Sequence, residues 1–90
     1  NKMLDKKPKM VKNLKIIEYI GSLYATTDGE KIWEIDRVVY EVLKLCDGKR
    51  TVEEIAEELA REAEVKKEDI IPLITDMIKE LEKRNFIEYV

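Results

Sequence analysis

The chain of 90 residues contains one cysteine and no histidine, which limits the covalent chemistry open to its side chains. A thiol nucleophile needs a neighbouring base, most often histidine, so Cys46 lacks its usual partner. Cys46 also occupies an apolar position of a predicted helix, where a small buried residue is more common than a reactive one. A lone cysteine excludes an internal disulfide and a metal-binding cysteine pair. We therefore predict no catalytic residue, no metal site and no cofactor, and a reducing, cytoplasmic environment.

The carboxylates are the other side chains that could act as acids, bases or metal ligands. There are 20 of them, but they are spread over helix faces predicted to be solvated, with no glycine-rich loop or cleft beside them. An enzyme is therefore the least favoured class of function.

Recognition through the backbone is the chemistry that the sequence supports better. The segment Lys31–Ile35 is predicted to be the last strand of a meander, and an edge strand presents unpaired amide and carbonyl groups. Lys31 and Glu34 are the only charged residues of this segment that would disfavour pairing with a further strand. The last predicted helix has an apolar arc of ~160°, wider than the ~100° stripe that a surface helix needs. Something besides the core is expected to lie against that helix.

Three strands must position this edge. Alternating and β-prone residues predict strands over Val11–Ile20, Ser22–Thr27 and Glu30–Ile35. The dipeptide Asp28-Gly29 between the last two is typical of a two-residue type I′ hairpin turn.

The turn at Asp28-Gly29 also predicts a register for the hairpin. A two-residue turn there places Tyr24 opposite Trp33 and Ala25 opposite Ile32. The aromatic pair would add roughly 0.2 to 1 kcal/mol to the stability of the sheet.

Three helices are predicted after the strands. Asp36 is a good N-cap for the first helix. This helix places Val38, Val39, Val42, Leu45 and Cys46 on one face. It ends at Asp47-Gly48, where the glycine acts as the left-handed C-cap. Thr51 and Glu54 form a capping box for the second, and its buried stripe is Val52, Ile55, Ala56, Leu59, Ala60 and Ala63. The third spans Glu68–Arg84, where Pro72 is tolerated only near the helix start or kinks the first turns. A short extended tail follows a possible C-cap at Asn85.

The connector Asp47–Thr51 has a structural and a functional interpretation. A C-cap, a turn and an N-cap in sequence explain it as a corner between two helices, and this interpretation is favoured over contact with a partner enzyme.

The order of elements and several local motifs resemble the PqqD-like family. The matching motifs are Ile35-Asp36, Leu45-Cys46-Asp47-Gly48, Arg50-Thr51-Val52-Glu53-Glu54-Ile55 with Leu59, and Glu68-Asp69-Ile70 through Leu81 to Phe86-Ile87-Glu88. The resemblance covers about Val11 to Tyr89. The family includes the pyrroloquinoline-quinone synthesis protein D and the recognition elements of ribosomally made, modified peptides. Pro72 departs from the family pattern and could alter the wall of the binding groove.

The resemblance implies an α+β fold, in which a three-stranded antiparallel sheet precedes three helices in a winged-helix-like arrangement. It also implies a non-catalytic peptide chaperone that binds the leader of a precursor peptide by strand addition and presents it to a maturation enzyme, often of radical-SAM type. Carried over to this chain, the receiving strand is Lys31–Ile35 and the groove helix is Glu68–Lys83. The implied peptide-binding residues are Lys31, Ile32, Trp33, Glu34 and Ile35 on the strand and Ile71, Ile74, Thr75 and Ile78 on the helix.

The charge distribution bears on the domain organisation and on other partners. Residues 1–10 are rich in lysine and are predicted to form a flexible basic tail before a single domain over residues 11–90. The net charge of −3 argues against general nucleic-acid binding, and no apolar run is long enough to span a membrane. The high content of lysine and glutamate is of the kind found in thermophile proteins.

Two alternatives stay open beside peptide recognition. A winged-helix DNA-binding protein is one, although six glutamates crowd the second helix, which should approach the phosphates. A generic protein-interaction domain is the other. The expected state is a monomer or a weak homodimer.

Overall fold

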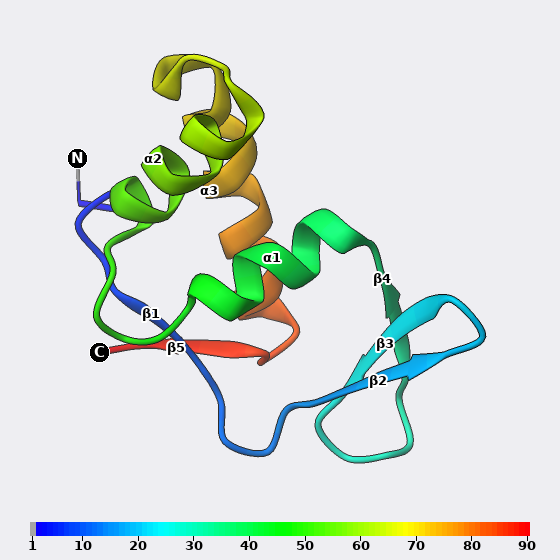
Figure 1. Cartoon of the computed structure of the whole chain (residues 1–90). Helices are drawn as coiled ribbons and strands as arrows, with labels where there is room; N and C mark the ends of the chain where they lie inside the picture. The colour runs from blue at the N-terminus through cyan, green and yellow to red at the C-terminus, as the bar shows by residue number, and fades with distance from the viewer. Residues whose placement is uncertain (1) are drawn as a thin grey trace.

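The computed structural model describes residues 2–90, which form three helices and two antiparallel sheets (Figure 1). The elements in chain order are β1 (Pro8–Met10), β2 (Lys15–Tyr19), β3 (Ser22–Thr26), β4 (Trp33–Ile35), α1 (Arg37–Leu45), α2 (Val52–Ala63), α3 (Lys67–Lys83) and β5 (Ile87–Tyr89). Strands β2, β3 and β4 pair in that order, and β1 pairs with β5. The predicted α+β class, with a three-stranded antiparallel sheet and three helices, is confirmed. The second sheet was not predicted.

The type I′ turn lies in a different hairpin from the predicted one. Ile20 and Gly21 connect β2 to β3 with φ values of 47° and 79°, and a type I′ turn requires positive φ at both central residues. Tyr19 pairs with Ser22 on either side of them. The prediction of this turn at Asp28-Gly29 was therefore wrong.

A longer loop joins β3 to β4, because side chains capture the amides that a tight hairpin would use. The Thr26 hydroxyl accepts a hydrogen bond from the Gly29 amide at 2.8 Å. The Asp28 carboxylate accepts from the amides of Glu30 and Lys31 at 2.8 and 2.9 Å. These bonds favour an irregular loop over continued pairing of the strands.

The longer loop also changes the register of β3 and β4. Trp33 lies opposite Ala25, and Tyr24 lies opposite Glu34. The predicted pairings of Tyr24 with Trp33 and of Ala25 with Ile32 are therefore both wrong. Trp33 is instead free to contact the helices.

The N-caps predicted for the first two helices, Asp36 and Thr51, are confirmed. The Asp36 carboxylate accepts from the Val39 amide at 2.8 Å, and both bonds of the capping box between Thr51 and Glu54 are present. Helix α3 starts at Lys67 without a side-chain cap and continues through Pro72. Asn85 follows its C-terminus with a φ of 61°, which supports the predicted cap.

The N-terminal segment is part of the folded structure, in contrast to the prediction of a flexible tail. Strand β1 pairs with β5 and places Lys9 opposite Glu88. The Leu4 and Lys6 carbonyls accept hydrogen bonds from the first amides of α2, at Glu53 and Val52. These amides lack partners within a helix, so the segment satisfies the start of α2 and holds the chain ends together (Figure 1).

The core lies between the helices and the inner faces of the two sheets. Its largest fully buried side chains are Phe86, Leu43, Ile55, Ile74, Ile78, Leu81, Val42, Val52 and Pro8. Two residues predicted to be buried lie outside it, because Val38 is half exposed and Ala63 is exposed. None of the helices in residues 2–90 is both long enough and apolar enough to cross a membrane.

Candidate functional site

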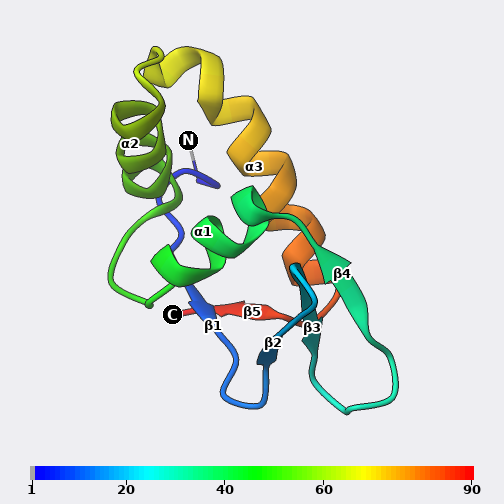
Figure 2. The same cartoon turned by 45° about the vertical axis from the view of Figure 1, so that its right-hand side comes forward.

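Strand β4 has a free edge. It is the last strand of the β2–β3–β4 sheet and pairs only with β3 within the described residues. Figure 2 shows β4 with β3 on one side and the last turns of α3 nearby. A free edge of this kind can receive a further strand.

The turn geometry identifies the backbone groups on this edge. The pair Tyr19 and Ser22 closes a two-residue turn, and such a closing pair exchanges both of its hydrogen bonds. The bonding direction alternates along β3, so Ala25 bonds in the opposite direction, toward its partner Trp33. The amide and carbonyl of Glu34 therefore point away from β3, toward the free edge.

The end of α3 forms the other side of the site. The guanidinium of Arg84 lies over the ring of Trp33, 4.3 Å from its centre, which is a cation–π contact. A hollow of about 360 Å³ lies beside this contact, and its lining includes Lys31, Glu80 and Lys83. A peptide added to β4 would therefore have α3 as its second neighbour.

The two flanks of α3 face different parts of the molecule. Residues three or four apart share a helix face, so Leu73, Met77 and Glu80 lie on the flank of Arg84. Leu73 is 59% exposed there. The C-terminal end of this flank faces β4, because Arg84 contacts Trp33. Leu73 lies further along the helix, in an apolar hollow of about 380 Å³ that Val38 of α1 and Leu59 of α2 also line.

The opposite flank carries Ile71 and Thr75, together with Glu82. The Tyr89 hydroxyl of β5 donates a hydrogen bond to the Glu82 carboxylate at 3.1 Å. Ile71 and Thr75 are half-buried and lie on the flank directed toward β5.

The predicted binding residues are thus brought together only in part. Trp33, Glu34 and Ile35 form β4, and Lys31 and Ile32 belong to the loop before it. Ile74 and Ile78 are 1% and 0% exposed, so they support the wall of the site from within the core. Arg84, Leu73 and Met77 were not predicted as site residues, although their spacing at positions 73, 77 and 84 is that of one helix face.

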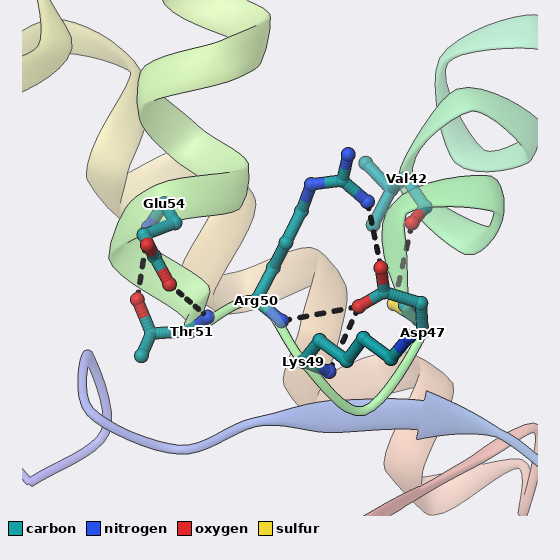
Figure 3. A network of polar contacts seen from close by, with 7 residues as sticks. Val42, Asp47, Lys49, Arg50, Thr51 and Glu54 are labelled. Carbon is teal, nitrogen blue, oxygen red and sulfur yellow. Dashed lines mark hydrogen bonds and ion pairs between the residues drawn. The ribbon is translucent and has the colours of Figure 1, made fainter.

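The connector between α1 and α2 is held by its own contacts (Figure 3). The Asp47 carboxylate accepts from the amides of Lys49 and Arg50 at 2.9 and 3.1 Å, and Arg50 also forms an ion pair with it at 2.8 Å. The Gly48 amide donates to the Pro8 carbonyl. These bonds support the structural interpretation of the connector.

Gly48 has a role other than the predicted helix cap. Helix α1 ends at Leu45, with Cys46 as its cap, and Gly48 follows in the turn with a φ of 78°. A Cβ atom there would lie 3.1 Å from Val90 and 3.2 Å from Lys9. Glycine therefore suits this position because of its positive φ, and the side chains of Lys9 and Val90 leave little room for a Cβ atom.

Cys46 is buried, and its thiol lies 3.2 Å from the Val42 carbonyl. Burial, with a smaller effect of Asp47, raises the pKa of the Cys46 thiol to about 12. Such a thiol carries very little thiolate at neutral pH, which is the reverse of what a nucleophile needs. In residues 2–90 no cluster of histidine, cysteine or carboxylate side chains is arranged to hold a metal ion.

Comparison with known families agrees with this architecture. The family model described as "Coenzyme PQQ synthesis protein D (PqqD)" matches residues 23–87, which include β4, all three helices and the start of β5. No curated protein matches the chain.

Proposed function

The chain belongs to the PqqD family, and this membership fits a peptide-binding protein associated with PQQ synthesis. From it and from the free edge of β4 we propose a non-catalytic peptide chaperone. The protein binds the leader of a ribosomally synthesised precursor peptide as an added strand and presents it to a maturation enzyme of the radical-SAM type. The observation that carries the proposal is the position of Glu34 at the free edge, next to the end of α3.

The proposed strand addition uses two kinds of contact. The amide and carbonyl of Glu34 exchange hydrogen bonds with the peptide backbone, which sets its register. Peptide side chains alternate between the two faces of the extended sheet. Those on the inner face meet Trp33 with Glu80 and Arg84, which line the same hollow, and further along the peptide they meet the flank of α3 that carries Met77 and Leu73.

The contact between Trp33 and Arg84 supplies a ready surface for an apolar peptide side chain. Trp33 is 38% exposed, so much of its ring is already covered by the protein. Arg84 holds the ring from one side, which reduces the ordering that binding would require.

A substitution at Glu34 tests the backbone contact directly. Proline is tolerated on an edge strand where its missing N–H would face solvent, so Glu34→Pro should fold and lose one donor to the peptide. We expect it to weaken binding about tenfold, which is about 1.4 kcal/mol. Isothermal titration with a synthetic leader, taken from a short precursor gene beside the gene of this protein, measures the affinity.

Glu34→Ala is the matched control, because it removes the same side chain and keeps the amide. Its leader affinity should stay within about twofold of the wild type. Melting curves of both variants establish that they are folded. Equal affinity of folded Glu34→Pro and Glu34→Ala would count against strand addition at β4.

The proposed enzyme partner has a separate test. A radical-SAM enzyme encoded near the gene should bind the protein and should modify the precursor peptide faster in its presence. A modification rate that does not depend on this protein would exclude the presenting role, even if the leader binds.

A further inference from the structure

The outer face of the β2–β3–β4 sheet carries apolar side chains without a cover. This outer face is defined by Ile17, Tyr19, Tyr24 and Ile32, which line a shallow hollow of about 240 Å³. Ile17, Tyr19 and Ile32 are 44%, 65% and 56% exposed. Exposed apolar groups gathered on one face of a small protein indicate an interaction site more often than scattered ones do.

Ile20, next to this face, is an independent sign of function. It is 84% exposed and has a φ of 47° at the tip of the β2–β3 turn. Asparagine or glycine suits this position, whereas a β-branched residue there is strained. An exposed, strained, apolar residue adds nothing to folding, and strain of this kind gathers at functional positions.

The outer face is too small to form a stable complex by itself. Strands β2 and β3 have five residues and β4 has three, so at about 3.4 Å per residue and 4.8 Å between strands the face measures at most roughly 250 Å². A stable complex buries roughly 800 Å² on each partner. A partner that docks on this face must therefore also contact a neighbouring surface.

The outer face is continuous with the proposed leader-binding edge. Ile32 immediately precedes β4, and the Glu34 side chain projects from the same face as Tyr24, which it opposes. A peptide added to β4 would widen this face by about 4.8 Å and place its own outward side chains beside Ile32. A protein that acts on the peptide can therefore contact both at once.

We propose that the outer face with Ile20 is the docking surface for the enzyme that modifies the bound peptide, which contributes an apolar surface to the contact. The added leader strand completes the surface, so the enzyme binds the loaded protein more tightly than the empty one. This inference rests on the proposed function and assigns a second surface to it, which adjoins the leader-binding edge. Ile17 and Tyr19 of β2 lie two strands away from the leader-binding edge, with Ile20 directly after them.

A double variant, Tyr19→Ser with Ile20→Asn, tests this assignment. With the radical-SAM enzyme encoded near the gene, the variant should bind at least tenfold more weakly than the wild type, both empty and loaded with leader. Its affinity for the leader should stay within twofold. Ile20→Asn alone should melt at a higher temperature than the wild type, because asparagine tolerates positive φ.

Val65→Ser is the control for a general loss of apolar surface. Val65 is 49% exposed and belongs to the segment that joins α2 to α3. This segment lies away from the β2–β3–β4 sheet (Figure 1), so enzyme binding should not change. Unchanged enzyme affinity of the double variant, with normal leader binding, would overturn the docking surface and leave the proposed function intact. A wild-type dimer in sedimentation analysis that the double variant abolishes would also overturn it.

Failure of the proposed function gives a different result. In that case the wild-type protein binds no leader, whatever residues occupy positions 19 and 20, and the docking inference fails with it.

Discussion

Three exposed carboxylates hold the loops of this protein by accepting hydrogen bonds from backbone amides. The amides of Glu30 and then Lys31 lower the pKa of Asp28. The amide of Lys49 is the main cause of the lowered pKa of Asp47. The amide and hydroxyl of Thr51 lower the pKa of Glu54. The hydrogen bonds to each carboxylate are therefore stronger when the carboxylate is ionised than when it is protonated.

These lowered pKa values predict how stability depends on pH. As pH falls through the ordinary values of 4.5 for Glu and 3.8 for Asp, the unfolded chain takes up protons before the folded protein does. The stabilisation is complete above this range and is lost as pH falls through the lowered values in the folded state. Melting temperature should decline from about pH 4.5 downward. Glu54→Gln, whose cap does not titrate, should show a shallower decline, and an equal slope would exclude Glu54 as a contributor.

Thr51→Ala tests the capping box by itself. The Thr51 hydroxyl accepts from the Glu54 amide at 3.1 Å, and its loss should lower the free energy of unfolding by roughly 0.5 to 2 kcal/mol. Leader affinity, measured well below the melting transition, should stay unchanged. Thr51→Ser, which keeps the hydroxyl, is the control. Loss of leader binding without loss of stability would reveal a binding role for the connector.

At the scale of elements, the two flanks of α3 give a prediction about the groove. Leu73→Asp places a charge on the flank that ends at Arg84, in the apolar hollow that Val38 and Leu59 also line. A leader added to β4 that extends along this flank covers Leu73, so we expect its affinity to fall about tenfold or more, because the charge must be desolvated against the peptide. Ile71→Asp lies on the flank toward β5 and should lower melting temperature more than affinity. Titration and melting of both variants decide between the flanks. If Ile71→Asp lowers leader affinity more than Leu73→Asp does, the flank of Ile71 lines the groove, as the sequence analysis predicted.

How far the sequence predicts these elements depends on whether the deciding contacts are local. Caps such as Asp36 and Thr51 act within one helical turn, so the residue types alone are enough to predict where those helices start. The hairpin turn was misplaced because Asp28-Gly29 fits a type I′ turn better than Ile20-Gly21 does, whereas in the structure Thr26 and Asp28 bind the amides of Gly29 and Glu30 with their side chains.

The candidate site was predictable to a similar extent. The edge position of β4 follows from strand order, which the sequence pattern gives. The flank of α3 that faces β4 depends on long-range packing, seen here in the contact of Arg84 with Trp33. Helical periodicity identifies which residues share a flank, but it does not identify the neighbour of that flank.

At the scale of the whole molecule, the β1–β5 sheet and the N-terminal segment join the chain ends to the start of α2. Deletion of residues 1–10 removes the backbone hydrogen bonds that involve Leu4, Lys6, Pro8 and Met10. Each is worth on the order of 1 kcal/mol, so we expect a fall of several kcal/mol in denaturant unfolding. A variant with residues 2–10 scrambled keeps their charge and their backbone groups but displaces the buried Pro8, so it should lose less stability than the deletion. Full stability of the deletion variant would show that the segment is dispensable.

The β1–β5 sheet also bears on the order of events in folding. It pairs strands from opposite ends of the chain, whereas the helices and the β2–β3–β4 meander bring together neighbouring segments. Long loops cost more entropy to close, and contacts between distant residues tend to form late. The sheet should therefore close last during folding and open first in native-state fluctuations. Amides at Met10 and Val90, which donate to Cys46 and Lys7, would then exchange with solvent faster than those in the middle of α3.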